Sequence, residues 1–168
     1  MRKLSVANID ERLYPVLEKV TDPEVPVLTI LDLGIVRYAG FSDDGLIKIK
    51  ITPTYSGCPA MDVIQFEINA AFETAGFHNV TIETILSPAW TTDWMTDEGK
   101  EKLKNYGIAP PAEKTSDLSF IMGSSKVIDC PHCGSSNTEM ISLFGSTACK
   151  SLYKCNDCQE PFDYFKCH

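Results

Sequence analysis

The sequence predicts an α+β protein, in which a small two-layer domain with the order α-β-β-α-β precedes a C-terminal four-cysteine zinc ribbon. Two observations lead to this fold class. Helical and strand-like apolar patterns alternate through roughly the first half of the chain, and two Cys-x-x-Cys pairs follow near its C-terminus. We expect residues 1–108 to form the first domain, residues 109–125 a proline-rich and then polar linker, and residues 126–168 the ribbon.

The first helix is expected over residues 9–20. Its apolar residues recur at helical spacing, and Asn8 with Glu11 forms a capping-box pattern at its start. Pro15 lies inside this pattern, so we expect tertiary packing to accommodate a kink. The two prolines of residues 21–26 then end the helix.

The remaining elements of the first domain follow from apolar alternation and from turn residues. Strands are expected over residues 35–41, 46–52 and 80–86, and the second of them alternates isoleucine with lysine. A second helix is expected to begin at Pro59, which suits a first helical turn, and to end at Gly76. A short helix is expected from about residue 96 to residue 106.

The two C-terminal cysteine pairs have the spacing of a structural zinc site. Each pair can place two thiolates on one ion, and the 21 residues between the pairs are enough to bring both to the same ion. The predicted ligands are Cys130, Cys133, Cys155 and Cys158. Disulfides and a metal-free redox pair are the alternatives. The chain shows no signal-peptide pattern, and cysteines in a reducing compartment favour metal binding over disulfides.

Charge and hydropathy exclude two classes of partner. No stretch approaches the ~20 apolar residues of a membrane span, and we expect a cytoplasmic protein without membrane contact. Ribbons that bind nucleic acid neutralise phosphates with basic surfaces. Here the net charge is −8, and residues 126–168 carry lysines and acids in similar number. We therefore expect a protein partner and no nucleic acid.

Cys58 is the candidate functional cysteine of the first domain. It lies in a Gly-Cys-Pro turn at the expected start of the second helix, where unpaired N–H groups and the helix dipole favour an anion. We expect this setting to lower the thiol pKa and to favour the thiolate, which binds soft metals. Thr54 is among several hydroxyl residues that surround it. The alternative is a small cysteine that packs under the helix start.

Asp22 and Glu24 form a second candidate group. They flank a proline in a rigid turn, which could hold both carboxylates toward a site beside Cys58. The alternative is ordinary turn chemistry. Trp90 and Trp94 are expected to pack in the core, with a partner-binding patch as the alternative.

Cys149 and Cys167 remain after the four zinc ligands are assigned. Either could replace a ligand, belong to a second soft-metal site, or serve as a simple structural cysteine. The sequence carries no Ser/His/Asp or Cys/His signature and no carboxylate–histidine set for a di-iron site. It therefore does not support autonomous catalysis.

These motifs together resemble known families. Residues 22–26, 33–36 and 52–59 resemble the small domain of SufT-type iron–sulfur assembly proteins, the metal–sulfur cluster assembly family. Residues 87–94, 106–111, 144–150 and 160–167 look like the D-protein family of bacterial phenylacetate degradation, whose members are called the D or J subunit of the phenylacetyl-CoA epoxidase. The resemblance covers nearly the whole chain from about residue 10.

The resemblance implies a metal–sulfur cluster assembly domain with a C-terminal extension over residues 1–108. It also implies a multicomponent monooxygenase as the partner system, with a di-iron centre in the catalytic subunit and flavin and an iron–sulfur cluster in the reductase. Cys58 matches the family cysteine associated with cluster handling. Asp22 and Glu24 match the family's acidic turn, and the two cysteine pairs match the ribbon ligands.

We therefore predict an accessory maturation factor for the phenylacetyl-CoA 1,2-epoxidase of aerobic phenylacetate catabolism, with structural zinc in the ribbon. Cys58 would assist assembly of an iron or iron–sulfur centre in the catalytic or reductase subunits. One cysteine cannot complete a cluster site, so a transient cluster would need a homodimer, Cys149 or Cys167, or an exogenous thiol. The alternatives are a non-catalytic structural subunit of the epoxidase complex and a thiol-dependent oxidoreductase.

Overall fold

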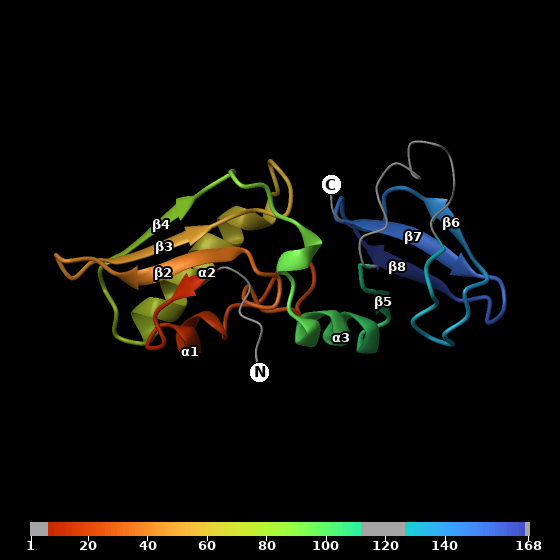
Figure 1. Cartoon of the computed structure of the whole chain (residues 1–168), viewed down its shortest axis with the longest axis horizontal. Helices are drawn as coiled ribbons and strands as arrows, with labels where there is room; N and C mark the ends of the chain where they lie inside the picture. The colour runs from red at the N-terminus through yellow and green to blue at the C-terminus, as the bar shows by residue number, and fades with distance from the viewer. Residues whose placement is uncertain (1–6, 112–126, 167–168) are drawn as a thin grey trace. The chain divides into compact units, whose positions relative to one another are not determined.

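The computed structural model describes residues 7–111 and 127–166. The chain divides into two compact units between Gly99 and Lys100 (Figure 1). This division lies earlier than the boundary expected after residue 108, because Ile108 and Ala109 form strand β5 and pair with a strand of the second unit. Most of the expected linker, residues 112–125, lies outside the described residues.

The first unit is built on a four-stranded sheet with the order β1-β2-β3-β4. The strands are β1 (Asn8–Ile9), β2 (Val36–Phe41), β3 (Ile47–Ile51) and β4 (Val80–Thr84). β2 and β3 form an antiparallel hairpin, whereas β1 runs parallel to β2 and β4 runs parallel to β3. A parallel pair needs a crossover connection, and helix α2 (Ala60–Thr74) supplies it between β3 and β4.

Helix α2 and the sheet form the two layers of this unit, with α2 behind the sheet in the view of Figure 1. The isoleucines of β3 are buried on one face, and the lysines between them are exposed or half-buried. The buried stripe of α2 consists of Ala60, Met61, Ile64, Ile68 and Phe72. The predicted α+β class is confirmed, because both patterns bury one face against the other layer.

The first helix is shorter than the expected 9–20. Helix α1 spans only Tyr14–Leu17, and Asn8 lies in β1 instead of acting as a helix cap. Pro15 occupies the first turn of α1, where it suits a helix start and not a helix interior. The residues before it pair with β2, because that non-local contact satisfies their backbone groups better than a helix across the proline would.

The segment after β4 packs back onto the turn that precedes β2. The buried Trp90 donates its indole N–H to the Leu33 carbonyl at 2.8 Å. Trp94 ends a short 3-10 helix, η1 (Thr92–Trp94), and the Arg37 guanidinium lies over its ring at 3.5 Å from the centroid. Core packing is therefore confirmed for Trp90, whereas Trp94 is only half-buried under a cation.

Helix α3 (Asp97–Asn105) lies within the short helix expected over residues 96–106. The sheet that follows has the order β5-β8-β7-β6. Its strands are β5 (Ile108–Ala109), β6 (Thr138–Ser142), β7 (Lys150–Cys155) and β8 (Pro161–Phe165). β6, β7 and β8 are antiparallel neighbours, and β5 joins β8 in parallel. Tyr153 stacks on Phe162 and meets the edge of Tyr164 in a small core beside the cysteines.

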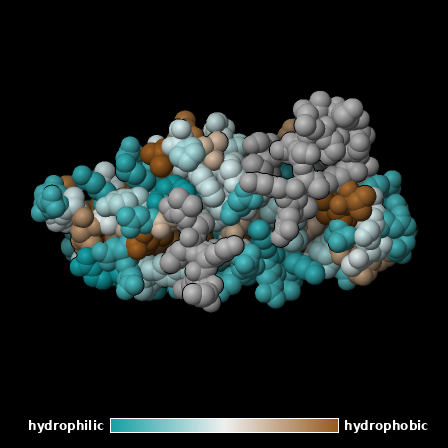
Figure 2. Space-filling model, viewed as in Figure 1, coloured by the Kyte–Doolittle hydropathy of each residue, from teal (hydrophilic) through white to brown (hydrophobic). Residues whose placement is uncertain are grey.

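The surface in view is mainly hydrophilic with separate apolar patches, one of them over the ribbon (Figure 2). Within the described part of the chain, the exposed large apolar side chains are Val63, Phe66, Leu86, Tyr106, Val127, Ile141, Leu143 and Phe144. No described helix has the length and apolar character needed to cross a bilayer.

Candidate metal centre and cysteine site

The four cysteines of the ribbon converge on one point. The sulfur atoms of Cys130, Cys133, Cys155 and Cys158 all lie within 4.8 Å of one another. The Cys130 and Cys158 sulfurs are 3.7 Å apart, and those of Cys133 and Cys155 are 3.6 Å apart. A zinc–sulfur bond of about 2.3 Å gives a tetrahedral edge of about 3.8 Å, so the spacing and the all-sulfur donor set both fit one tetrahedral zinc ion.

Two backbone turns present these sulfurs. In the first, the N–H of Gly134 donates to the Cys130 carbonyl at 2.9 Å, with Gly134 at a positive φ of 77°. In the second, the N–H of Cys158 donates to the Cys155 sulfur at 3.5 Å. This N–H is the main cause that lowers the pKa of Cys155 to about 7, whereas burial and the neighbouring thiols raise the pKa of Cys158.

Asp157 connects the two turns. Its carboxylate accepts hydrogen bonds from the Ser135 hydroxyl and from the Asn137 side-chain amide, the latter at 2.8 Å. These bonds hold the pKa of Asp157 below its ordinary value. Because Asp157 stands between two cysteines of one turn and Ser135 follows the other, the bonds fix the turns relative to each other.

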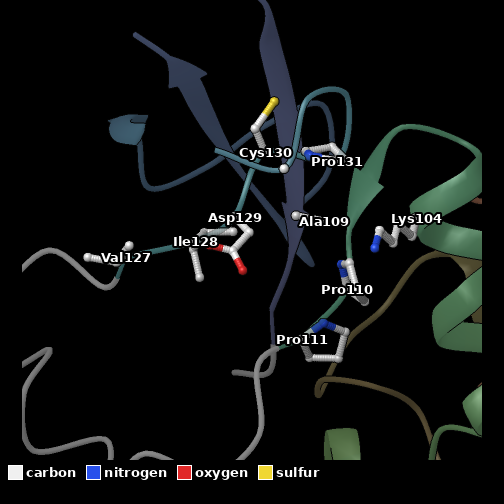
Figure 3. A pocket seen from close by; sticks show the side chains of 10 residues that line it. Lys104, Ala109, Pro110, Pro111, Val127, Ile128, Asp129, Cys130 and Pro131 are labelled. Carbon is white, nitrogen blue, oxygen red and sulfur yellow. The ribbon is translucent and has the colours of Figure 1, made fainter. Parts of the chain in front are cut away.

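A cavity of about 380 Å³ adjoins the first turn (Figure 3). Its lining is mainly apolar and prolyl, and its charged side chains are Lys104 and Asp129. The sulfur of Cys130 points away from Ile128 and Ala109 in Figure 3, toward the other cysteines. Cys130 therefore belongs both to the lining of the cavity and to the four-sulfur group.

Of the two remaining ribbon cysteines, Cys149 is not part of the four-sulfur group. Cys149 is buried just before β7, and its sulfur lies 3.0 Å from the Thr147 hydroxyl. Cys167 lies outside the described residues. The hypothesis that either one replaces a zinc ligand or forms a second metal site stays a prediction.

Cys58 lies just before α2 in a tight turn. Its N–H donates to the Tyr55 carbonyl at 3.3 Å, and its own carbonyl accepts the N–H of Met61 at 3.2 Å. Gly57 takes a φ of 79° with open space at its Cβ position, so glycine serves the backbone conformation there and not a close contact. The half-buried thiol accepts hydrogen bonds from the Ala60 backbone and the Tyr55 hydroxyl.

The expected lowering of the Cys58 pKa is wrong. Burial is the largest influence and raises the pKa of the thiol, and the negative charges of Glu24 and Asp22 raise it further. The hydrogen bonds from Ala60 and Tyr55 act in the opposite direction without reversing the result. Around neutral pH the neutral thiol form of Cys58 is therefore favoured over the thiolate.

Asp22 and Glu24 lie close enough to Cys58 to act on it electrostatically. The Asp22 carboxylate accepts the N–H groups of Glu24 and Val25, both at 2.8 Å. Both acidic side chains are half-buried. Asp22 thus performs turn chemistry, and the supporting role of both carboxylates at Cys58 stays a prediction.

Removal of one of these charges has a testable effect on the thiol. We expect Glu24→Gln to speed the alkylation of Cys58 by iodoacetamide at pH 7.5, because the lost negative charge lowers the pKa and enlarges the thiolate fraction. The difference from the wild type should narrow as the pH rises and the thiol ionises in both proteins. Glu67→Gln, on the exposed face of α2, is the control. Equal rates for the wild type and Glu24→Gln at every pH would contradict the electrostatic contact.

Two threonines precede Cys58 in the loop. The Thr52 hydroxyl is buried and has no hydrogen-bond partner among the residues that the structure describes. A buried hydroxyl without a partner costs about 1–3 kcal/mol, which marks this end of β3 as a place where a ligand could supply the missing bond. Thr54 is half-buried in the same loop, and its supporting role stays a prediction.

Asp32 is a structural residue and not part of this site. It is buried, and its carboxylate accepts the Thr29 N–H at 2.9 Å and the Thr96 hydroxyl at 3.2 Å. These bonds tie the turn before β2 to the segment that enters α3. The sequence did not reveal this function, because the partner at residue 96 is distant in the chain.

Comparisons with known proteins agree with the two units. Residues 10–83 match the family described as iron-sulfur cluster assembly protein, and residues 114–166 match the PaaD zinc beta ribbon domain. Of the curated proteins, one from Escherichia coli (strain K12), provisionally named as the D subunit of 1,2-phenylacetyl-CoA epoxidase, is 48% identical over 155 residues. The match covers 92% of this chain and 91% of that protein.

The chain belongs to the D-protein family of the phenylacetyl-CoA epoxidase. Two shorter relatives match a little more than half of the chain. One is an Fe-S protein maturation auxiliary factor of Porphyromonas gingivalis (strain ATCC BAA-308 / W83), 32% identical over 56% of this chain and 90% of that protein. The other is the Fe-S protein maturation auxiliary factor YitW of Bacillus subtilis (strain 168), 32% identical over 55% of this chain and 90% of that protein.

A solved structure supports the fold of the first unit. The crystal structure of a domain of unknown function, DUF59, from Bacillus anthracis is similar with a TM-score of 0.51 and 26% identity. The similarity covers 55% of this chain and 88% of that domain. The family thus combines a DUF59-like α+β unit with a zinc-ribbon unit.

Proposed function

We propose that this protein is an accessory factor that helps to assemble or repair an iron or iron–sulfur centre of the phenylacetyl-CoA epoxidase. The observation that carries the proposal is the position of Cys58 in the turn before α2, within electrostatic reach of Asp22 and Glu24, in the unit that matches the iron–sulfur cluster assembly family. The similarity to Fe-S maturation auxiliary factors supports the assembly role. The similarity to a D subunit of the epoxidase supports the epoxidase as the partner system.

The chemistry of the site suits a cationic cargo. The raised pKa of Cys58 favours the neutral thiol, and a bound metal ion would displace its proton to give the thiolate ligand. The carboxylates of Asp22 and Glu24 attract a cation to the same place. The protein thereby keeps the thiol unreactive when it carries no metal.

A single thiolate leaves most ligand positions of an iron–sulfur cluster to other groups. We propose that the recipient, an exogenous thiol or a second copy of this chain supplies them, and that the protein passes its cargo onward because its own hold is incomplete. The ribbon is proposed to bind one zinc ion for structural purposes through Cys130, Cys133, Cys155 and Cys158.

Metal analysis of three proteins tests the role of Cys58. We expect anaerobically purified wild type, after incubation with ferrous iron and sulfide, to contain iron, sulfide and about one zinc per chain. Cys58→Ala should keep the zinc but lose iron at least about tenfold, because the thiolate ligand is gone. Cys149→Ser tests the other candidate ligand: iron loading like that of the wild type would exclude Cys149 from the site, and a parallel loss would include it. Equal iron in wild type and Cys58→Ala would contradict the proposal.

A second candidate function is a purely structural subunit of the epoxidase. It is favoured by the similarity to a D subunit of the epoxidase along 91% of that protein's length. This function requires stoichiometric co-purification with the catalytic subunits and indifference to Cys58. Growth on phenylacetate separates the two, because a structural subunit with Cys58→Ala supports full growth and a maturation factor does not.

A further inference from the structure

The outward face of α2 carries apolar side chains that the fold does not use. Phe66 is 69% exposed and Val63 is 45% exposed, although both lie on the helix whose other face forms the core. At 100° per residue, Phe66 points almost directly away from the buried stripe of Ile64, Ile68 and Phe72. Burial in this unit therefore does not account for Phe66.

Helix stability explains only part of the charge on α2. The helix contains Asp62, Glu67 and Glu73, all exposed, and no basic residue. Asp62 in the first turn is favourable toward the helix dipole, but Glu73 in the last turn is unfavourable. The outward face thus combines an apolar centre with a border whose charged residues are all acidic.

This face adjoins the end of the unit that carries Cys58. Val63 and Phe66 stand only about 5 Å and 9 Å along the axis from the start of α2, and Cys58 immediately precedes that start. The exposed Leu86 follows β4 at the same end of the sheet, because Thr84 pairs with Ile51 just before the Cys58 loop. A protein seated on this face would lie beside the thiol.

We propose that the outward face of α2, with Phe66 at its centre, is the docking surface for the epoxidase subunit that receives the metal centre. The proposal rests on the proposed function and names the partner's contact chemistry. The recipient presents an apolar pocket for Phe66, surrounded by lysine or arginine side chains that meet Asp62, Glu67 and Glu73. The acidic border excludes a second copy of this face, which would bring like charges together.

Binding measurements with the full chain test this surface. Each purified epoxidase subunit, including the metal-free reductase, is titrated into the wild type and Phe66→Ala by calorimetry. We expect one subunit to bind the wild type, and Phe66→Ala to bind it at least about tenfold more weakly, as truncation of a central aromatic anchor does. Phe144→Ala removes an aromatic ring of similar exposure from the ribbon, and it should bind like the wild type.

The acidic border has a separate readout. The triple variant Asp62→Asn, Glu67→Gln, Glu73→Gln should associate more slowly, and its binding should depend less on salt than that of the wild type. Binding that is unaffected by Phe66→Ala, equal losses in Phe66→Ala and Phe144→Ala, or no binding to any subunit would overturn the proposal. Self-association that Phe66→Ala abolishes would also overturn it, in favour of a second copy as the occupant.

Failure of this inference is distinguishable from failure of the proposed function. Phe66→Ala should retain iron loading and thermal stability, because Phe66 is exposed and alanine favours helix. Cys58→Ala should lose iron loading but keep subunit binding. Iron loading at Cys58 with no role for Phe66 would leave the proposed function intact and remove only this docking surface.

Discussion

Replacement of Cys155 by serine is expected to remove the zinc ion and unfold the second unit while the first unit stays folded. Cys155 is fully buried at the end of β7, and its sulfur faces that of Cys133 at 3.6 Å. Serine cannot supply the thiolate that a four-sulfur zinc site needs. Zinc should fall from about one per chain to none.

The size of the effect follows from the small core of the ribbon. Besides two of the cysteines themselves, its buried cluster contains Ala109, Ile128, Tyr153, Phe162 and Tyr164. Units this small rarely hold together by apolar burial alone, whereas structural zinc contributes about 10–16 kcal/mol of apparent binding free energy in comparable peptides. The free energy lost with the ion is therefore larger than the remaining contacts of β6, β7 and β8 can offset.

Amide hydrogen exchange checks this expectation for each unit separately. In Cys155→Ser, the amides of β6, β7 and β8 should lose protection, and those of β2 and β3 should keep it. Cys149→Ser, another buried ribbon cysteine, should retain both zinc and protection. A zinc-free Cys155→Ser protein with a protected ribbon would show that the metal is not the main support of this unit.

The sequence predicted those elements of the fold that are determined by residues close together in the chain. The alternation in β3, the apolar stripe of α2 and the Cys-x-x-Cys spacing each describe neighbours in one element or one turn. The first helix was predicted to be longer than it is, because its expected first residues belong to strand β1. That strand forms by parallel pairing with β2, and residues 7–10 show no apolar alternation that would indicate it. The β-strand at Ile108 was missed for the same reason, since its partner is β8.

The candidate site was predicted in composition but not in electrostatics. The sequence indicated Cys58, Asp22 and Glu24 as residues of interest, and it placed the thiol correctly before the second helix. It could not supply the sign of the pKa shift, because burial and the approach of two carboxylates are tertiary effects. A helix start lowers a thiol pKa only where such effects are small.

Substitution of Gly34 by alanine is expected to destabilise the first unit by several kcal/mol. Gly34 has a φ of 68°, which costs a residue with a Cβ roughly 1–2 kcal/mol. In addition, a Cβ at this position would overlap the Trp94 carbonyl oxygen and stand 2.7 Å from its carbonyl carbon. Both are backbone atoms, so relief of the clash requires the 90–96 segment to move away from the turn before β2.

That movement would break the contacts that join the two segments. The hydrogen bond from the Trp90 indole to the Leu33 carbonyl would be lost, as would the one from the Thr96 hydroxyl to Asp32. The buried Asp32 carboxylate would then keep fewer hydrogen-bond partners. We therefore expect a loss of about 3–5 kcal/mol, the range of substitutions that disrupt both packing and buried hydrogen bonds. For a unit of this size the unfolding temperature should fall by more than about 10 °C.

Gly45→Ala separates the two causes. Gly45 has a similar φ of 78°, but a Cβ there would meet nothing within 4 Å. It should therefore show only the backbone cost of about 1 kcal/mol. Thermal unfolding followed by tryptophan fluorescence reports on the first unit, because both tryptophans, Trp90 and Trp94, lie in it. Equal losses in the two variants would mean that the close approach of Trp94 to Gly34 contributes nothing to stability.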